Sequence, residues 1–225
     1  LNGPCLARML GLPGDPLEDR ADGVVPATGP SGVRGISTEL LEEEGAPVRW
    51  KGPASDRFIW QGAAEAGVLR EFLADVVWGE LDYLLVDVPP GTDKIGRFLD
   101  LVPRPDQVLL VTIPSPAAEA VVARSATFLV ETGVESVGVV RNMSGYAPPD
   151  GGVTLPLFSG DEGDAPVAGP EMEVWARIPF APRLGQLTDR GRAPGAGLEG
   201  PVGRAFGALA ERVERGPGGR RREAP

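Results

Sequence analysis

The sequence predicts an α/β fold: a doubly wound, mainly parallel sheet with helices on both faces. Short apolar runs of strand length alternate with longer segments of helical spacing, as in βαβ units. The runs are nearly continuous in apolar residues, which is typical of parallel strands that are buried on both faces. The clearest of them cover residues 83–86, 107–113 and 136–140.

The N-terminal part of the chain is predicted to contain more loop than regular structure. Residues 4–11 favour a short helix or turn, and residues 13–32 form a polar segment rich in proline and glycine, which is typical of a loop. A short strand is expected at 33–37 and a helix over 56–76.

From residue 81 onward, predicted strands and helices follow one another regularly. The first strand ends at Asp87, where a Pro-Pro-Gly sequence breaks the apolar run. The later elements are expected to be a helix at 94–102, a strand at 107–113, a helix at 117–132, a strand at 136–140, a short strand near 153–158, a strand at 174–178 and a helix at 198–215.

Composition limits the partners and the compartment. The chain has 225 residues and a net charge of −10, so its overall field argues against nucleic acid and against an anionic membrane as partners. Its single cysteine, Cys5, excludes an intrachain disulfide and fits a reducing cytoplasm. No apolar stretch has the length of a transmembrane helix.

Asp87 is the first candidate functional residue because of its place at the end of an apolar run. Ligands of open α/β sheets bind beyond the carboxyl ends of the strands. Mg²⁺ keeps several of its waters and takes few protein carboxylates, so Asp87 is a candidate to hold Mg²⁺ through a water. Gly91 and Thr92 follow in the turn and are candidates to contact a γ-phosphate. The alternative is an Asp that caps a rigid turn.

A set of short segments occurs in a fixed order along the chain: NGPCLARMLG (2–11), PVRWKGP (47–53), WGELDY (78–83), DVPPGT (87–92), VTIP (111–114), GVVRNMS (138–144) and IP (178–179). Together they resemble the Mrp/ApbC family of deviant-Walker P-loop ATPases, which are linked to iron–sulfur cluster delivery and related to MinD and ParA. The resemblance implies a P-loop NTPase fold that binds ATP and Mg²⁺ in a homodimer. It also implies hydrolysis coupled to the assembly or transfer of an iron–sulfur cluster, with cluster-receiving client proteins as partners.

The same resemblance gives roles to two residues further along the chain. It implies that Asn142 recognises adenine through its side-chain amide, which offers both a donor and an acceptor. It implies that Pro179 packs on the base. From the residues alone, Asn142 is also acceptable as a strand-end turn residue, and Pro179 as an ordinary end to a strand.

One departure from the family concerns the phosphate loop GKGGVGKST, which the 225 residues do not contain. The two lysines, Lys51 and Lys94, are not followed by Ser or Thr. We therefore expect the first strand and the loop to precede Leu1, residues 1–215 to form an incomplete P-loop NTPase domain, and residues 216–225 to form a disordered tail. On this interpretation the full-length parent is an ATP hydrolase, whereas the chain as given is inactive.

A second departure concerns cysteine. Many family members carry a CxxC motif shortly after the Asn-Met-Ser segment, but residues 144–151 contain no cysteine. Thiolates are the usual ligands of iron–sulfur clusters, so the sequence argues against a cluster bound by this segment.

Two other functions remain open from the sequence. A non-catalytic remnant or scaffold of the same fold would explain the absent loop and the absent cysteines. A positioning ATPase of the MinD/ParA type would need an amphipathic membrane helix or a basic surface. The apolar stripe of Val202, Phe206, Leu209 and Val213 has helical spacing, and we predict that it packs in the core instead.

Overall fold

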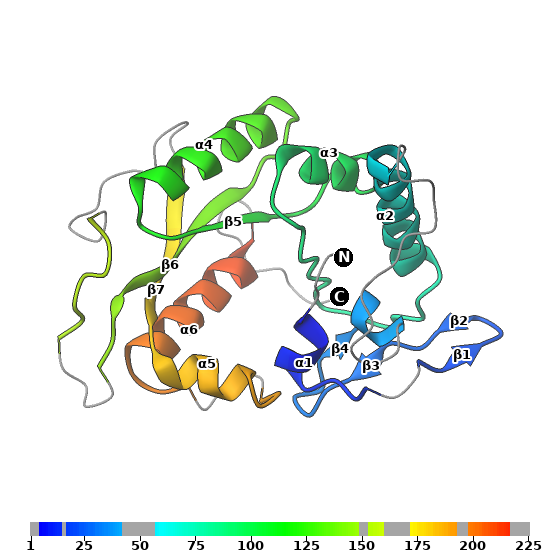
Figure 1. Cartoon of the computed structure of the whole chain (residues 1–225), viewed down its shortest axis with the longest axis horizontal. Coiled ribbons are helices and arrows are strands. Elements are labelled where there is room, and N and C mark those ends of the chain that lie inside the picture. The colour runs from blue at the N-terminus through cyan, green and yellow to red at the C-terminus, as the bar shows by residue number, and fades with distance from the viewer. Residues whose placement is uncertain are drawn as a thin grey trace. The chain divides into compact units, whose positions relative to one another are not determined.

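The structure is a computed structural model that describes residues 5–14, 17–41, 57–148, 153–159, 172–192 and 198–216. The chain divides into two compact units (Figure 1). The first comprises Leu1–Leu101 and Gly185–Gly195, and the second comprises Val102–Leu184 and Ala196–Pro225. The predicted tail, apart from Gly216, lies outside the described residues.

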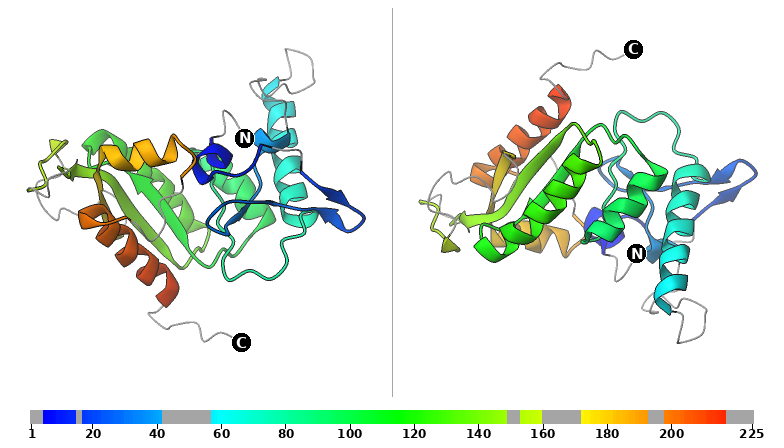
Figure 2. Two further views of the ribbon diagram at one scale, coloured as in Figure 1. Left: turned by 90° about the horizontal axis from the view of Figure 1, so that it is seen from below. Right: turned by 90° about the horizontal axis from the view of Figure 1, so that it is seen from above.

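The second unit is built on a three-stranded parallel sheet with the order β5-β6-β7. Helix α4 lies on one face of this sheet and helix α6 on the other, as Figure 2 shows. The elements are β5 (Val108–Thr112), α4 (Pro116–Glu131), β6 (Val137–Tyr146), β7 (Glu173–Phe180) and α6 (Gly200–Arg215). The predicted α/β class, with a parallel sheet and helices on both faces, is thereby confirmed.

The core of the second unit follows the apolar patterns of the sequence. Val140, Ala176 and Ile178 of the sheet are buried together with Val202 of α6. Phe206 and Leu209 pack against this cluster, which confirms that most of the predicted stripe on α6 faces the core. On α4, the buried residues are Ala126 and Leu129.

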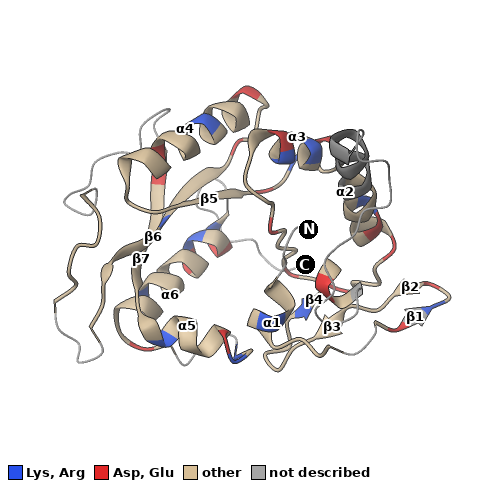
Figure 3. Cartoon of the chain, in the orientation of Figure 1, with Lys and Arg blue, Asp and Glu red and all other residues tan. Residues whose placement is uncertain are grey.

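Trp175 joins β6, β7 and α6. A Cβ atom added to Gly138 of β6 would lie 2.2 Å from the Trp175 ring, so the indole occupies the space that a side chain would need. The Arg212 guanidinium of α6 lies 4.6 Å from the ring centroid and forms an ion pair of 2.7 Å with Glu173. Helix α6 carries both signs of charge (Figure 3), and its Arg212 contacts tie it to β7.

The described residues of the first unit form two small antiparallel hairpins and the α-helices α1, α2 and α3, together with the end of α5 (Pro182–Thr188). Its elements are α1 (Leu6–Leu10), β1 (Asp19–Arg20), β2 (Gly23–Val24), β3 (Ala27–Thr28), β4 (Arg34–Gly35), the 3₁₀ helix η1 (Thr38–Leu41), α2 (Arg57–Ala74) and α3 (Thr92–Leu101). An isolated parallel bridge joins Val24 to Val76, so the β1–β2 hairpin is attached to the segment that follows α2.

Several predicted boundaries differ from the structure. The expected loop at 13–32 contains the strands β1 to β3, and the expected strand at 136–140 continues to Tyr146. The expected strand near 153–158 is reduced to one antiparallel bridge between Tyr146 and Leu155. Helix α5 (Pro182–Thr188) was not predicted at all. It begins in the second unit and ends in the first.

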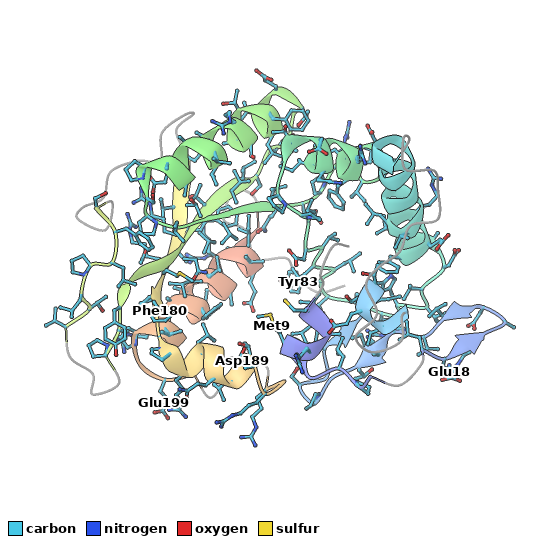
Figure 4. The ribbon with its side chains drawn as sticks, viewed as in Figure 1. Met9, Glu18, Tyr83, Phe180, Asp189 and Glu199 are labelled. Carbon is cyan, nitrogen blue, oxygen red and sulfur yellow. The ribbon has the colours of Figure 1, made fainter. Side chains whose placement is uncertain are left out.

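The predicted strand that ends at Asp87 is wrong. Residues 83–89 have no strand pairing, and the side chains of the run are exposed, with Leu85 at 85% and Tyr83 at 48%. Tyr83 is labelled in Figure 4. A strand needs a neighbour that completes its backbone hydrogen bonds, and in the described part of the chain no strand pairs with this run. The apolar pattern of residues 83–86 indicates a strand, but a pattern within one segment does not reveal whether another strand pairs with it.

The described residues contain no helix that is both long enough and apolar enough to span a membrane.

The tight packing at Gly138 gives a stability prediction. We expect Gly138→Ala to lower the free energy of unfolding by about 1–3 kcal/mol, because the new methyl group forces the Trp175 ring or the strand to move. Gly207→Ala is the matched control: Gly207 lies inside α6 with open space around it, and we expect a gain of about 0.4–1 kcal/mol. Urea denaturation followed by tryptophan fluorescence measures both, and equal effects would contradict the packing.

Candidate functional site

The first group of candidate residues lies in the turn that leads into α3. Asp87 is exposed and precedes the Pro-Pro-Gly turn. The Gly91 carbonyl accepts backbone hydrogen bonds from Lys94 and Ile95, at 3.1 and 3.2 Å, so Gly91 occupies the N-cap position and Thr92 begins the helix. The first N–H groups of a helix have no partner within it and favour anions. The turn therefore places one carboxylate shortly before a helix N-terminus.

Glycine is required at position 91 because its φ of +119° is disfavoured for residues with a side chain. The Pro-Pro-Gly-Thr sequence therefore fixes how the chain enters α3.

Arg34 of β4 holds the segment that leads into this turn. Its guanidinium donates hydrogen bonds to the carbonyl oxygens of Trp78 and Glu80. Between these two residues, Gly79 has a φ of +66°, and a Cβ atom there would lie 2.9 Å from Nη1 of Arg34. The Trp-Gly-Glu segment is thus shaped to fit the arginine. Sequence reasoning missed Arg34, because the two partners are more than forty residues apart and lie in irregular structure.

The second group of candidate residues lies on β6 and β7. Asn142 of β6 is in register with Ile178 of β7, and Pro179 is the next residue. The structure therefore brings Asn142 and Pro179 close together on neighbouring strands. Pro179 lies within β7 and is buried, whereas we had expected it just past a strand. Proline is tolerated there because β7 is the edge strand of the sheet among the described residues and the register shifts between Asn142 and Tyr146.

The Asn142 amide has a defined orientation. Its Oδ1 accepts a hydrogen bond of 3.0 Å from the Met143 N–H, so the Nδ2 donors lie on the other side of the amide. Met143 adopts a φ of +54°, in the left-handed region that few residues with a side chain occupy. The Ser144 hydroxyl donates to the Arg141 carbonyl at 3.3 Å. Residues 141–144 therefore form a compact irregularity within β6.

Arg141 and Glu119 form a buried ion pair beside Asn142. Arg141 is 1% exposed, and its Nε lies 2.8 Å from Oε1 of Glu119, in the first turn of α4. Sequence reasoning missed this pair. The available signal was an arginine directly after the apolar run 137–140, since a charge buried in a sheet needs a partner.

The residues fit some of the groups that the sequence suggested. A carboxylate such as Asp87 is a suitable oxygen ligand for Mg²⁺, and the Asn142 amide is suitable for the edge of a base. A lysine-bearing phosphate loop is absent from the 225 residues. Among the described residues, no group of three or more His, Cys, Asp or Glu side chains could hold a metal ion. The single cysteine, Cys5, is exposed.

Comparison with known proteins adds a family match over nearly the whole chain. Residues 1–214 match the model of a ParA family described as NUBPL iron-transfer P-loop NTPase. An iron–sulfur cluster carrier protein of Saccharolobus solfataricus is 32% identical over 192 residues, which cover 84% of this chain and 62% of that protein. A cytosolic Fe-S cluster assembly factor, the NUBP1 homolog of Caenorhabditis elegans, is 32% identical over 84% of this chain and 59% of its own length.

A solved structure is also similar. The nucleotide-binding protein of Archaeoglobus fulgidus in complex with ADP is 27% identical, with a TM-score of 0.59, over 84% of this chain and 70% of that protein. Against the two sequence relatives, the chain spans about three fifths of their length.

The Asn142–Met143 contact gives a prediction that does not depend on any ligand. Asn142→Asp keeps the oxygen that accepts from the Met143 N–H, whereas Asn142→Leu removes it. We expect the leucine variant to be less stable than the aspartate variant by about 0.5–1.5 kcal/mol, the usual contribution of one hydrogen bond. Denaturant unfolding of both variants measures the difference. Equal stabilities would show that the contact does not hold the amide.

Proposed function

Because this chain belongs to the NUBPL iron-transfer P-loop NTPase family, we propose that its full-length protein binds ATP with Mg²⁺ and couples ATP hydrolysis to the assembly or transfer of an iron–sulfur cluster. The observation that most supports this proposal is the turn from Asp87 to Thr92, where a carboxylate comes shortly before the N-terminus of α3. This arrangement suits a phosphate-bound Mg²⁺ and its phosphate.

In this proposal, each residue of the turn has a separate task. Asp87 would hold Mg²⁺ through a water, and the ion would supply positive charge to the phosphates when bound. The Gly91 backbone and Thr92 contribute N–H and hydroxyl groups to the γ-phosphate. Arg34 keeps the preceding Trp78–Glu80 segment in place, so that the turn presents the same geometry to each nucleotide.

The base would be recognised at Asn142, within β6. With Oδ1 of Asn142 held by the Met143 N–H, the Nδ2 donors are directed to an acceptor on the edge of adenine. Pro179 supports the neighbouring strand end, against which the base packs. The relative whose structure contains ADP supports a nucleotide as the ligand.

The remaining parts of the proposal concern cargo, partners and location. An iron–sulfur cluster is the cargo, as the name of the S. solfataricus carrier suggests, and a homodimer with client proteins is the working assembly. A cytoplasmic location is supported by relatives that are named cytosolic assembly factors. The cluster would need ligands other than a CxxC motif after Ser144, because that segment contains no cysteine.

A non-catalytic scaffold is the second candidate function. It is favoured by the sequence of residues 144–151, where the cysteines are missing from within the chain. A membrane-positioning ATPase has less support, because Val202, Phe206 and Leu209 of α6 belong to the core of the second unit.

The Mg²⁺ role of Asp87 is tested by nucleotide binding. We expect Asp87→Asn in the full-length protein to weaken binding of a non-hydrolysable ATP analogue about tenfold in Mg²⁺, equivalent to about 1.4 kcal/mol, and to have little effect in EDTA. Asp82→Asn is the matched control, since Asp82 is exposed on the same run. Isothermal calorimetry measures both variants. An unchanged affinity for Asp87→Asn in Mg²⁺ would contradict the assignment.

ATP hydrolysis distinguishes the enzyme from the scaffold. We expect the 225-residue chain alone to release no phosphate above background, because it has no phosphate loop whose lysine could reach the β- and γ-phosphates. The product of the complete reading frame should hydrolyse ATP if a GKGGVGK[ST] loop is encoded in frame upstream of Leu1. A complete product with no such loop and no ATP binding would favour the scaffold.

A further inference from the structure

We propose that Arg141 is a positioning residue for base recognition: its buried ion pair with Glu119 fixes β6 at Arg141 so that the neighbouring Asn142 amide faces the nucleotide. This inference rests on the proposed function, in which Asn142 contacts the base. It goes beyond that function by giving a task to a residue that no ligand can reach.

The ion pair ties the central strand of the sheet to α4. Arg141 is in register with Thr112 of β5 and Arg177 of β7, so its backbone is held between two strands. Its side chain leaves the sheet to meet Glu119 at 2.8 Å. Glu119 stands in the first turn of α4, where a negative charge is also favoured by the helix dipole. The position of Arg141 is therefore set from three elements.

Asn142 is coupled to Arg141 through a short and well-connected segment. The two residues are adjacent, the Ser144 hydroxyl donates to the Arg141 carbonyl at 3.3 Å, and the Met143 N–H donates to Oδ1 of Asn142 at 3.0 Å. Met143 holds a φ of +54° between these contacts. A shift of the Arg141 backbone would move its carbonyl, which accepts from the Ser144 hydroxyl. It would also move the adjacent Asn142, whose Oδ1 accepts from the Met143 N–H.

Burial determines that Arg141 acts through its neighbour and not on the ligand. A residue that is 1% exposed offers no surface to a nucleotide, whereas Asn142 is only half-buried and Met143 is 40% exposed. A buried ion pair is also weak evidence for stability, since apolar residues of similar volume often serve as well. The buried guanidinium still needs a negative partner, so the ion pair keeps Arg141 of β6 next to Glu119 of α4.

Binding of two ligands in the presence of Mg²⁺ distinguishes base recognition from phosphate binding. ATP carries both a base and phosphates, whereas tripolyphosphate has no base. In the full-length protein we expect Arg141→Met to weaken ATP binding about tenfold, the effect of one misplaced hydrogen bond, and to leave tripolyphosphate binding within about twofold. Asn142→Ala should give the same loss, and the double variant should lose no more, because both changes remove one interaction.

Two further variants control for folding and for chemistry. Glu119→Gln removes the charge that pairs with Arg141 but keeps the size of the side chain and a polar oxygen at this position, so it should retain more of the preference for ATP than Arg141→Met. Arg177→Met removes an exposed arginine from the register-paired position of β7 and should change neither affinity. If Arg141→Met gives no cooperative thermal unfolding, the comparison of Glu119→Gln with Glu119→Ala replaces it, with the alanine variant expected to lose the ATP preference.

The outcomes separate this inference from the proposed function. Equal losses for ATP and tripolyphosphate, or losses that add to that of Asn142→Ala, would show that Arg141 has only a structural role while the nucleotide function stands. A wild-type protein that binds ATP no more tightly than tripolyphosphate would overturn base recognition at Asn142, and the positioning role with it.

Discussion

Strand β6 is paired along both edges, and the organisation of the second unit depends on that double pairing. Its hydrogen bonds to β5 and β7 satisfy backbone groups that would otherwise be buried without partners. With the strand fixed, Val140 faces the cluster under α6, and Arg141 meets Glu119 of α4. The same strand then carries Asn142 to the end of the sheet where ligands of α/β proteins bind. One strand thus carries Val140 of the core, Arg141 of the ion pair and Asn142 of the candidate base site.

The run from Tyr83 to Val86 shows the opposite situation. It has the composition of a buried strand, yet no described strand pairs with it and its side chains are exposed. Apolar side chains favour burial by roughly 25 cal/mol per Å², but a strand forms only where its N–H and C=O groups also find partners. The turn that follows keeps its shape for another reason: the Gly91 N-cap and the Arg34 hydrogen bonds are local and need no sheet.

This contrast explains which features the sequence could predict. The helices α2, α4 and α6 could be predicted because the spacing of apolar residues within each segment is helical. The predictions of β5, β6 and β7 are confirmed because their apolar runs also have strand partners in the chain. The adjacency of Asn142 and Pro179 follows from the rule that the carboxyl ends of parallel strands meet at one edge. The hairpins at 19–35 were missed, since two-residue strands have no detectable period. Arg34 and Arg141 were missed because their partners depend on how distant segments pack.

Most candidate residues of this chain are held by contacts with residues close to them in the sequence. Asp87, Gly91 and Thr92 are arranged by one turn and a helix start, and Asn142 by a single strand irregularity. The groups that the 225 residues lack are a lysine on a glycine-rich loop and paired thiolates after Ser144. A phosphate loop binds through consecutive backbone amides and its lysine, and no surface carboxylate can substitute for them because its charge is of the wrong sign. Asp87 therefore fits the proposed Mg²⁺ role, whereas the proposed hydrolysis would also need residues of the opposite charge.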